Sequence, residues 1–367
     1  MLISSHLSVF RAHAPLRSSL SRADKNPGFM HSSCPASCGR CDALRGPLVA
    51  VQALPGLGGT AARHIRLGAE TGHRPRMGRR PRQRDLLLVA NYKSREPGQG
   101  VAVYEWRAGK ADDPGGVDRE ASWHLTEHID APGAGEATLC RISQTGEELL
   151  VLPSWNANGS FATDTQVLAF DVEHTRRSYR RDGHFPLFVR RQALPTHGSH
   201  DAECFVSDHG GEETAVLVVA NGRHDSGRRD VESAVYTYDV QAQRFVEVQR
   251  LQTVGAHDIE LLHETSMGTL AVVANGASWR TTGTGPGAPG LGEESCDDAD
   301  VHVYRWDVQA RRFALLQRLD PGGCTTFARA WRTGNGRTLL AVAVERLRSG
   351  SYDGGVRMFE WSEAPRT

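Results

Sequence analysis

The sequence predicts an all-β protein, and three observations support this prediction. Segments in which apolar and polar residues alternate recur along the chain, as in residues 244–251 and 256–264, and this period of two is typical of β-strands. Continuous apolar runs such as residues 269–275 follow them after glycine-rich or charged turns, and no helical period extends across them. The same order of segments returns five times after Gly46. We therefore expect four-stranded sheets that stack as the blades of a β-propeller.

The repeats define a predicted propeller domain over residues 47–363. The clearest copy starts at Arg244 with RFVEVQRL, continues through DIELLHE and TLAVVAN, and ends in the aromatic segment VHVYRW. The five copies cover residues 47–107, 122–173, 186–241, 244–309 and 312–363. A single four-stranded sheet cannot bury both of its faces, so we expect the copies to fold as one body.

The composition is that of a soluble globular protein. The chain has 367 residues, of which 39% are hydrophobic, and it carries 43 basic and 43 acidic residues. This balance gives no overall attraction to nucleic acid, and the longest apolar runs have the length of strands rather than of membrane spans. The size allows a large core.

Two kinds of residue recur at fixed places in the repeats. A glutamine or glutamate marks each first segment, at Gln52, Glu127, Gln192, Gln249 and Gln317. Its identical spacing favours a structural hydrogen bond over a functional site. The aromatic pairs Tyr104/Trp106, Tyr236/Tyr238 and Tyr304/Trp306 are expected to pack between blades.

Two segments differ in composition from the repeats. Residues 1–25 are rich in serine and arginine and have no acid before Asp24, which fits either a transit peptide or a disordered leader. Residues 73–84 form the basic run HRPRMGRRPRQR. This run could attract an anionic ligand, or it could be a solvated loop.

The best-conserved features of the repeats resemble the EAR (EPTP) repeat, which is known from the leucine-rich glioma-inactivated proteins. The matching pattern is F-x-x-x-Q-x-L, T-x-G-A-x-D-x-E, L-x-V-A-N and V-Y-x-W. The third and fourth repeats match through Gln192, His200, Asp201, Glu203, Ala220, Asn221, Gln249, Thr253, Gly255, Ala256, Asp258, Glu260, Ala274 and Asn275. The resemblance implies an extracellular interaction domain, and it implies a seven-bladed propeller of which five repeats are visible.

Residues 26–41 read NPGFMHSSCPASCGRC and are similar to the C-terminal half of a ShKT domain. The matching residues are Asn26, Pro27, Met30, Cys34, Ser37, Cys38 and Cys41. In that family these cysteines pair with three upstream cysteines, and none precedes Cys34 here. We therefore expect a partial ShKT-like module of a longer secreted protein. A zinc site on Cys34, Cys38 and Cys41 is the alternative.

The remaining cysteines fall on predicted strands or in loops. Cys296 and Cys324 lie in loops that share one face of the predicted propeller, so a disulfide between them is geometrically allowed. Cys140 and Cys204 fall on inner strands and are expected to be small buried hydrophobes. Asn158 begins the sequon Asn-Gly-Ser, which predicts glycosylation in an extracellular protein.

Two acidic pairs are the candidate metal ligands. Alternation places Asp201 with Glu203, and Asp258 with Glu260, on one side of each inner strand. Carboxylates that converge on a channel suit a calcium ion, and the resemblance also implies calcium in the channel. The alternative is that these acids accept hydrogen bonds from turn amides. The other repeats have Ala61 and Arg63, Glu136 and Thr138, and Thr326 and Ala328 at the two positions.

The sequence offers little support for catalysis. His200 and His257 precede aspartates, but neighbouring residues on a strand point to opposite faces and cannot act as a simple dyad. We therefore expect a non-enzymatic extracellular module that binds a protein partner. The alternatives are a metal-assisted hydrolase or lyase acting on extracellular polysaccharide, and a glycan-binding propeller that uses Trp155 and Trp279.

Overall fold

The structure is a computed structural model of the chain, and it is described here for part of the sequence. The described residues are 59–67, 84–91, 100–107, 122–157, 159–170, 187–264, 268–276, 278–280 and 293–361. The leader, the ShKT-like segment with Cys34, Cys38 and Cys41, Gln52, Asn158 and nearly all of the basic run 73–84 lie outside these residues.

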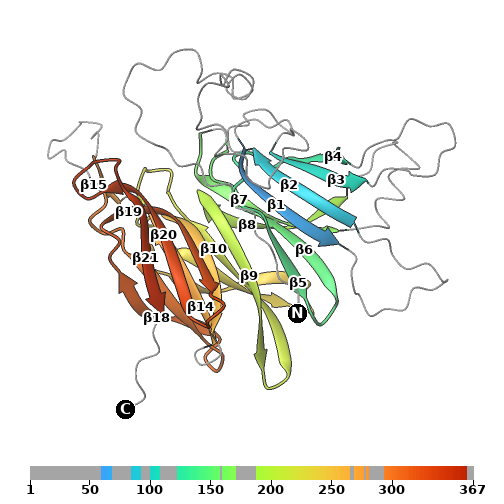
Figure 1. Cartoon of the computed structure of the whole chain (residues 1–367). Helices are drawn as coiled ribbons and strands as arrows, with labels where there is room; N and C mark the ends of the chain where they lie inside the picture. The colour runs from blue at the N-terminus through green and yellow to red at the C-terminus, as the bar shows by residue number, and fades with distance from the viewer. Residues whose placement is uncertain are drawn as a thin grey trace, which may run out of the picture. The chain divides into compact units, whose positions relative to one another are not determined.

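Strands account for the regular structure of the described residues, as the sequence predicts, and they form five large antiparallel sheets and one two-stranded hairpin (Figure 1). We number the sheets 1 to 5 in chain order. Sheet 1 contains β1 (Gly59–Leu67), β2 (Arg84–Asn91), β3 (Val101–Arg107) and β4 (Ser122–Ile129). Sheet 2 contains β5 (Thr138–Ile142), β6 (Glu147–Leu152), β7 (Ala162–Phe170) and β8 (Phe188–His197).

The next two sheets repeat this order. Sheet 3 contains β9 (Ser199–His209), β10 (Glu212–Asn221), β11 (Ser233–Asp239) and β12 (Arg244–Leu251). Sheet 4 contains β13 (Ala256–Glu264), β14 (Gly268–Asn275), β17 (Val301–Asp307) and β18 (Arg312–Leu319). A two-stranded hairpin, β15 (Ser278–Arg280) with β16 (Glu293–Ser295), is inserted between β14 and β17.

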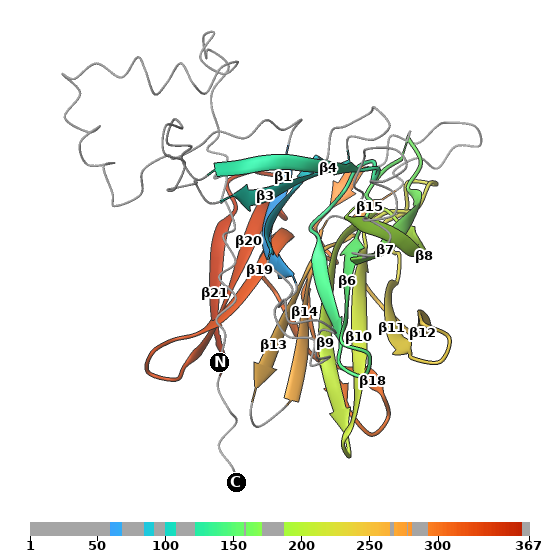
Figure 2. The same ribbon diagram turned by 90° about the vertical axis from the view of Figure 1, so that its right-hand side faces the viewer.

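Sheet 5 contains three strands within the described residues. They are β19 (Gly323–Arg332), β20 (Thr338–Leu347) and β21 (Gly355–Trp361). The first strand of each sheet is the inner strand, and β9 lies beside β13 (Figure 2). The five sheets confirm the β-propeller fold.

The sheets are offset by one strand from the repeats of the sequence. The segment RFVEVQRL, which opens the fourth repeat, is β12 and pairs with β11 of sheet 3. In the same way β18 opens the fifth repeat and closes sheet 4. The second to fifth repeats therefore each contribute their first strand to one sheet and their other strands to the next, which links consecutive sheets covalently through the outer edge.

The core lies between consecutive sheets. Separate clusters of buried apolar residues join sheets 1 and 2, 2 and 3, 3 and 4, and 4 and 5. Tyr236, Tyr238, Tyr304 and Trp306 belong to these clusters, as predicted for aromatic pairs. Trp106 is instead 39% exposed and contacts Trp123. On the side of sheet 5 that faces away from sheet 4, the exposed apolar residues are Phe327, Trp331, Val356 and Met358.

The recurring glutamine makes the structural hydrogen bonds that its spacing predicts. The amide of Gln192 on β8 donates to the backbone oxygen of Phe245 and accepts from the backbone nitrogen of the same residue, both at 2.8 Å. Gln249 on β12 makes the same two bonds to Phe313, at 2.8 and 2.7 Å. Each glutamine thus joins the outer strands of neighbouring sheets.

No helix among the described residues has the length and apolar character needed to cross a membrane.

Candidate functional site

The inner strands β9 and β13 place their acids toward the next sheet. Asp201 Oδ2 accepts a hydrogen bond from the backbone nitrogen of Ile259 at 2.9 Å. Asp258 Oδ2 accepts one from the backbone nitrogen of Ala328 at 2.7 Å. Both aspartates are almost fully buried. They therefore bond to backbone amides, but these amides belong to the inner strand of the neighbouring sheet and not to a turn.

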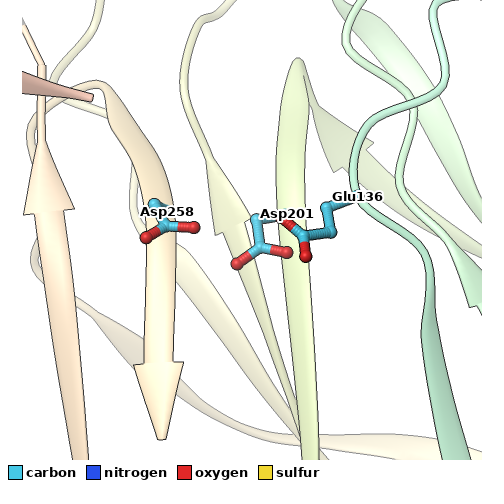
Figure 3. Close-up of side chains that lie close together, drawn as sticks. All are labelled: Glu136, Asp201 and Asp258. Atoms are coloured by element: carbon cyan, nitrogen blue, oxygen red, sulfur yellow. The ribbon is translucent and has the colours of Figure 1, made fainter. Parts of the chain in front are cut away.

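A third acid joins the two aspartates. Glu136 lies just before β5, and its backbone nitrogen donates to the backbone oxygen of His200 at 3.0 Å. One carboxylate oxygen from each of Glu136, Asp201 and Asp258 lies within 4.8 Å of the other two (Figure 3). We call these three residues the carboxylate cluster. The repeat pattern places Glu136 at this position of the second repeat, but Glu136 is not one of the ligands predicted from the sequence.

Glu203 and Glu260 lie beside the carboxylate cluster, where they pair with arginines. Arg63 on β1 lies 3.3 Å from Glu203, and Arg329 on β19 lies 3.1 Å from Glu260. Arg329 also lies 3.4 Å from Asp258 and 3.2 Å from Glu136. The four predicted acids are thus brought together. However, the carboxylates of Glu203 and Glu260 each pair with an arginine, so they do not simply converge on one ion with the two aspartates.

Arg329 occupies the position of Glu260 in its repeat, whereas the repeat pattern of the sequence predicts Ala328 at that position. The hydrogen bond from Ala328 to Asp258 corresponds to the bond from Ile259 to Asp201, so Arg329 is equivalent to Glu260. Two irregularities of register near the start of β19 displace its residues relative to the other repeats. The sequence pattern does not reveal this arginine, because a β-bulge inserts a residue without a clear sequence signal.

Burial raises the pKa of the acids at this site. Desolvation, reinforced by the charge of Asp258, holds the pKa of Asp201 well above its usual value. Desolvation raises the pKa of Asp258 to about 6 and that of Glu260 to about 7, although Arg329 lowers both. Four of the five carboxylates contact the guanidinium groups of Arg63 and Arg329, and Asp201 contacts neither. The fully ionised site of five acids and two arginines would carry an excess of three negative charges within the described residues.

Within the described residues, one buried oxygen of the carboxylate cluster has no hydrogen-bond partner. Asp201 is 2% exposed, and its Oδ1 atom is buried without a donor among the described residues. An unpaired buried carboxylate oxygen is unfavourable, so a proton or a cation is required there. All donor atoms of the cluster are oxygens, which suits a hard cation such as Ca²⁺.

A stack of aromatic rings lies at the same end of the inner strands. The ring centroids of Trp155 and His200 are 3.8 Å apart, and those of His200 and His257 are 4.2 Å apart. Burial lowers the pKa of His257 to about 4 and that of His200 well below its usual value, so both rings are neutral at pH 7. Each histidine precedes an aspartate of the cluster, and within the described residues no hydrogen bond joins His200 or His257 to Asp201 or Asp258, as the strand geometry predicts.

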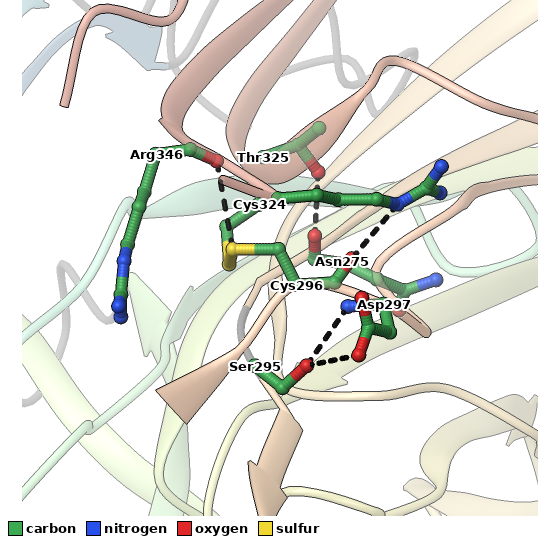
Figure 4. The surroundings of a disulfide bond; sticks show 8 residues. Asn275, Ser295, Cys296, Asp297, Cys324, Thr325 and Arg346 are labelled. Carbon is green, nitrogen blue, oxygen red and sulfur yellow. Dashed lines mark hydrogen bonds between the residues drawn. A yellow bond between two sulfur atoms is a disulfide. The ribbon is translucent and has the colours of Figure 1, made fainter. Parts of the chain in front are cut away.

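The structure contains two disulfide bonds within the described residues. Cys296 and Cys324 are bonded, with a Cα–Cα distance of 4.8 Å (Figure 4), which confirms the predicted link between sheets 4 and 5. Cys140 and Cys204 are also bonded, with a Cα–Cα distance of 5.5 Å. The expectation that these two are free buried hydrophobes is wrong, because β5 and β9 are neighbouring inner strands that bring their side chains together.

No family model matches the chain, and no curated protein sequence matches it, so the resemblances to EAR repeats and to ShKT domains stay predictions. Solved structures are similar at low levels. An exo-β-1,3-galactanase from Phanerochaete chrysosporium has a TM-score of 0.41 and 9% identity over 76% of this chain and 57% of its own. The Dos1 propeller has a TM-score of 0.37 and 10% identity over 77% of this chain and 57% of its own. An endo-arabinase from Bacteroides thetaiotaomicron has a TM-score of 0.37 and 8% identity over 76% of this chain and 90% of its own.

These comparisons contradict one expectation. The sequence predicts a protein that is not an enzyme, whereas several of the similar structures are glycoside hydrolases, including a family-43 enzyme with a TM-score of 0.35 and 11% identity. The matched part of this chain spans little more than half of the galactanase and of the Dos1 propeller. Similarity at this level concerns the fold, so a function must be argued from the site itself.

Proposed function

We propose that this protein is a calcium-dependent hydrolase of extracellular polysaccharide, with the cation bound by Glu136, Asp201 and Asp258. The observation that carries the proposal is the buried Asp201 Oδ1 atom, which lacks a donor while two further carboxylates lie within 4.8 Å. A cation at this point would satisfy that oxygen and would reduce the excess negative charge of the site.

The choice of calcium follows from the ligand atoms. Calcium takes six to eight oxygen ligands in flexible geometry, whereas zinc prefers nitrogen and sulfur. The cluster supplies only carboxylate oxygens, and the stacked imidazoles of His200 and His257 lie outside it. Water or substrate oxygens would complete the coordination.

The reaction class follows from the groups around the cluster. When bound, a divalent cation supplies Lewis-acid polarisation of a substrate oxygen. Glu203 and Glu260 offer carboxyl groups beside it, with side chains 16% and 18% exposed, and glycoside hydrolysis uses paired carboxyl groups for proton transfer. Arg63 and Arg329 hold these two carboxyl groups in position.

An extracellular location and an EAR-type repeat are part of this proposal. The two disulfide bonds support an oxidising compartment. The EAR-type assignment is supported by the recurrence of the same contacts. Asn221 accepts a hydrogen bond from the backbone nitrogen of His197 at the end of β8, Asn275 accepts one from that of Val254 just after β12, and each asparagine donates to a backbone oxygen.

The proposal is tested in two steps on chelator-treated protein. Isothermal titration with CaCl₂ should show one saturable site, which Asp201→Asn should abolish. Glu213→Gln, which changes an exposed acid on β10, should leave the site intact. The wild-type protein should then release reducing ends from some member of a panel of neutral and acidic polysaccharides only when Ca²⁺ is present.

The two steps separate the two parts of the proposal. Absence of calcium binding would reject the metal site and the dependence on it. Calcium binding without release of reducing ends from any polysaccharide would reject the hydrolase and leave only the cation site.

A further inference from the structure

The outer strands of sheets 1 to 4 share one chemistry. Each has an aromatic residue at its first or second position and carries a glutamine or glutamate four residues after it. The aromatic residues are Trp123, Phe188, Phe245 and Phe313, and the residues four positions later are Glu127, Gln192, Gln249 and Gln317. The polar side chain on one outer strand bonds to the backbone around the aromatic residue of the next, as Gln249 does with Phe313.

This series stops at Gln317. Its side chain is exposed and makes no such pair of bonds within the described part of the chain, whereas Gln192 and Gln249 are half-buried. The residue that would receive those bonds belongs to a fourth strand of sheet 5. Among the described strands β21 is the edge of that sheet, and none of these strands pairs with its outward backbone groups, which could pair with a further strand.

A groove runs between sheets 4 and 5 where that strand would lie. Its volume is about 250 Å³, and its lining includes Leu262, Gln317, Leu319, Phe359 and Trp361. The indole nitrogen of Trp361 is buried without an acceptor. The groove therefore combines an apolar floor with two polar groups that lack partners among the described residues.

The equivalent space between sheets 3 and 4 shows what fills such a groove. There the ring of Phe313 from β18 packs against Trp306 and Phe205, with centroid distances of 5.0 and 6.0 Å. Phe313 pairs with Trp306 across the strands. By the same register, an aromatic residue on a strand beside β21 would face Trp361 and occupy the groove.

We propose that β21 and this groove bind an extended segment of a protein partner as a fourth strand, with an aromatic side chain in the groove and its backbone held by the Gln317 amide. This is β-strand addition, in which main-chain bonds give affinity and a side-chain pocket gives specificity. The proposal does not depend on the hydrolase.

The partner segment is expected to follow the pattern of the four known outer strands. Its aromatic residue is followed after three residues by Gln or Glu, and two residues later by an aliphatic residue equivalent to Leu251 and Leu319. The chain has one further segment of this type, residues 48–54, but Leu48 stands at the aromatic position there. A leucine fills less of the groove than an aromatic ring, so we assign the groove to a partner.

A labelled peptide with the sequence of β12, RFVEVQRL, tests the proposal on the full-length protein. Fluorescence anisotropy should show saturable binding, and Gln317→Leu should weaken it at least tenfold. Gln249→Leu, which alters the corresponding amide of the filled groove, should leave the affinity unchanged. A peptide with its phenylalanine and glutamine exchanged should not bind. In the complex, hydrogen exchange should slow at the amides of β21.

Three outcomes would overturn the proposal. The first is the absence of saturable binding to the wild-type protein. The second is equal affinity for the wild type and for Gln317→Leu. The third is binding that appears only in a Leu48→Asp variant, because that result would mean that the chain's own segment takes the place assigned to a partner.

Discussion

Glu127 is the one acid in a position that Gln192 and Gln249 occupy in later sheets. Its Oε2 atom accepts a hydrogen bond from the backbone nitrogen of Leu187 at 2.8 Å. Burial raises its pKa to about 7, although the backbone amides of Leu187 and Phe188 lower it. The pKa of Glu127 is higher in the folded state than in the unfolded state. The contribution of protonated Glu127 to the free energy of unfolding is therefore complete below pH 4.5 and is lost as the pH rises through 7.

Glu127→Gln should remove this pH dependence. The variant should be more stable than the wild type at pH 8.5 by about 1–3 kcal/mol, since a neutral amide needs no desolvation of charge and can also donate to the backbone of β8. The difference should shrink toward pH 5. Urea unfolding of both proteins across this range measures it, and a difference that does not change with pH would contradict the assignment.

Gly276 lies against the histidine stack and has no room for a side chain. A Cβ atom there would lie 2.6 Å from His257 Cδ2 and 2.9 Å from the Gly255 oxygen. Gly276→Ala should therefore destabilise the protein by about 1–3 kcal/mol through overpacking. Gly334→Ala is the matched control, because a Cβ there meets nothing within 4 Å. Equal thermal stability of the two variants would show that the His257 ring moves aside at little energetic cost.

The residues of the site divide into those that the sequence could predict and those that it could not. Asp201 and Asp258 were predictable because both sit at the same place in a repeat and alternation fixes their side of the strand. Glu136 was harder to predict because its side chain is longer than that of the aspartates in the other repeats and because it lies just before β5 and not within the strand. Arg329 could not be placed, since its position depends on bulges in β19 that only the backbone pairing reveals.

At the scale of the strand, Gln249 and Gln317 form a matched pair for measuring the bond between outer strands. Gln249→Leu leaves the backbone nitrogen and oxygen of Phe313 without their side-chain partner, so it should destabilise the protein by about 1–3 kcal/mol. Gln317→Leu removes an exposed amide that makes no such bonds among the described residues, and it should change stability by less than about 0.5 kcal/mol. Similar losses for both variants, measured by urea unfolding, would mean that Gln317 is also engaged.

The sequence predicted the strands better than it predicted their grouping. Period-two alternation and apolar runs depend on local burial, so they indicated the strands of the five large sheets. The short strands β15 and β16 have neither pattern and were not predicted. The sheet to which a strand belongs depends on the neighbour with which it pairs. A repeating sequence does not show where one sheet ends and the next begins, because any of the four strands could be counted as the first. The offset of β12 and β18 by one sheet therefore became visible only in the pairing of the backbone.

At the scale of the whole molecule, the two disulfide bonds join consecutive sheets at different places. Cys140–Cys204 links the inner strands of sheets 2 and 3 across a separation of 64 residues, and Cys296–Cys324 links sheets 4 and 5 across 28. In a repeat architecture each sheet depends mainly on its neighbours. Loss of one link should therefore loosen the adjoining sheets more than distant ones.

Replacing Cys296 and Cys324 together by alanine tests this expectation. The variant should lose about 2–4 kcal/mol of stability, and hydrogen exchange should accelerate in β19, β20 and β21 while β9 and β10 stay protected. Cys140→Ala with Cys204→Ala should reverse the pattern by exposing β5 and β9 first. If either variant accelerated exchange equally in all five sheets, the propeller would unfold as one cooperative unit, and the disulfides would stabilise it globally and not sheet by sheet.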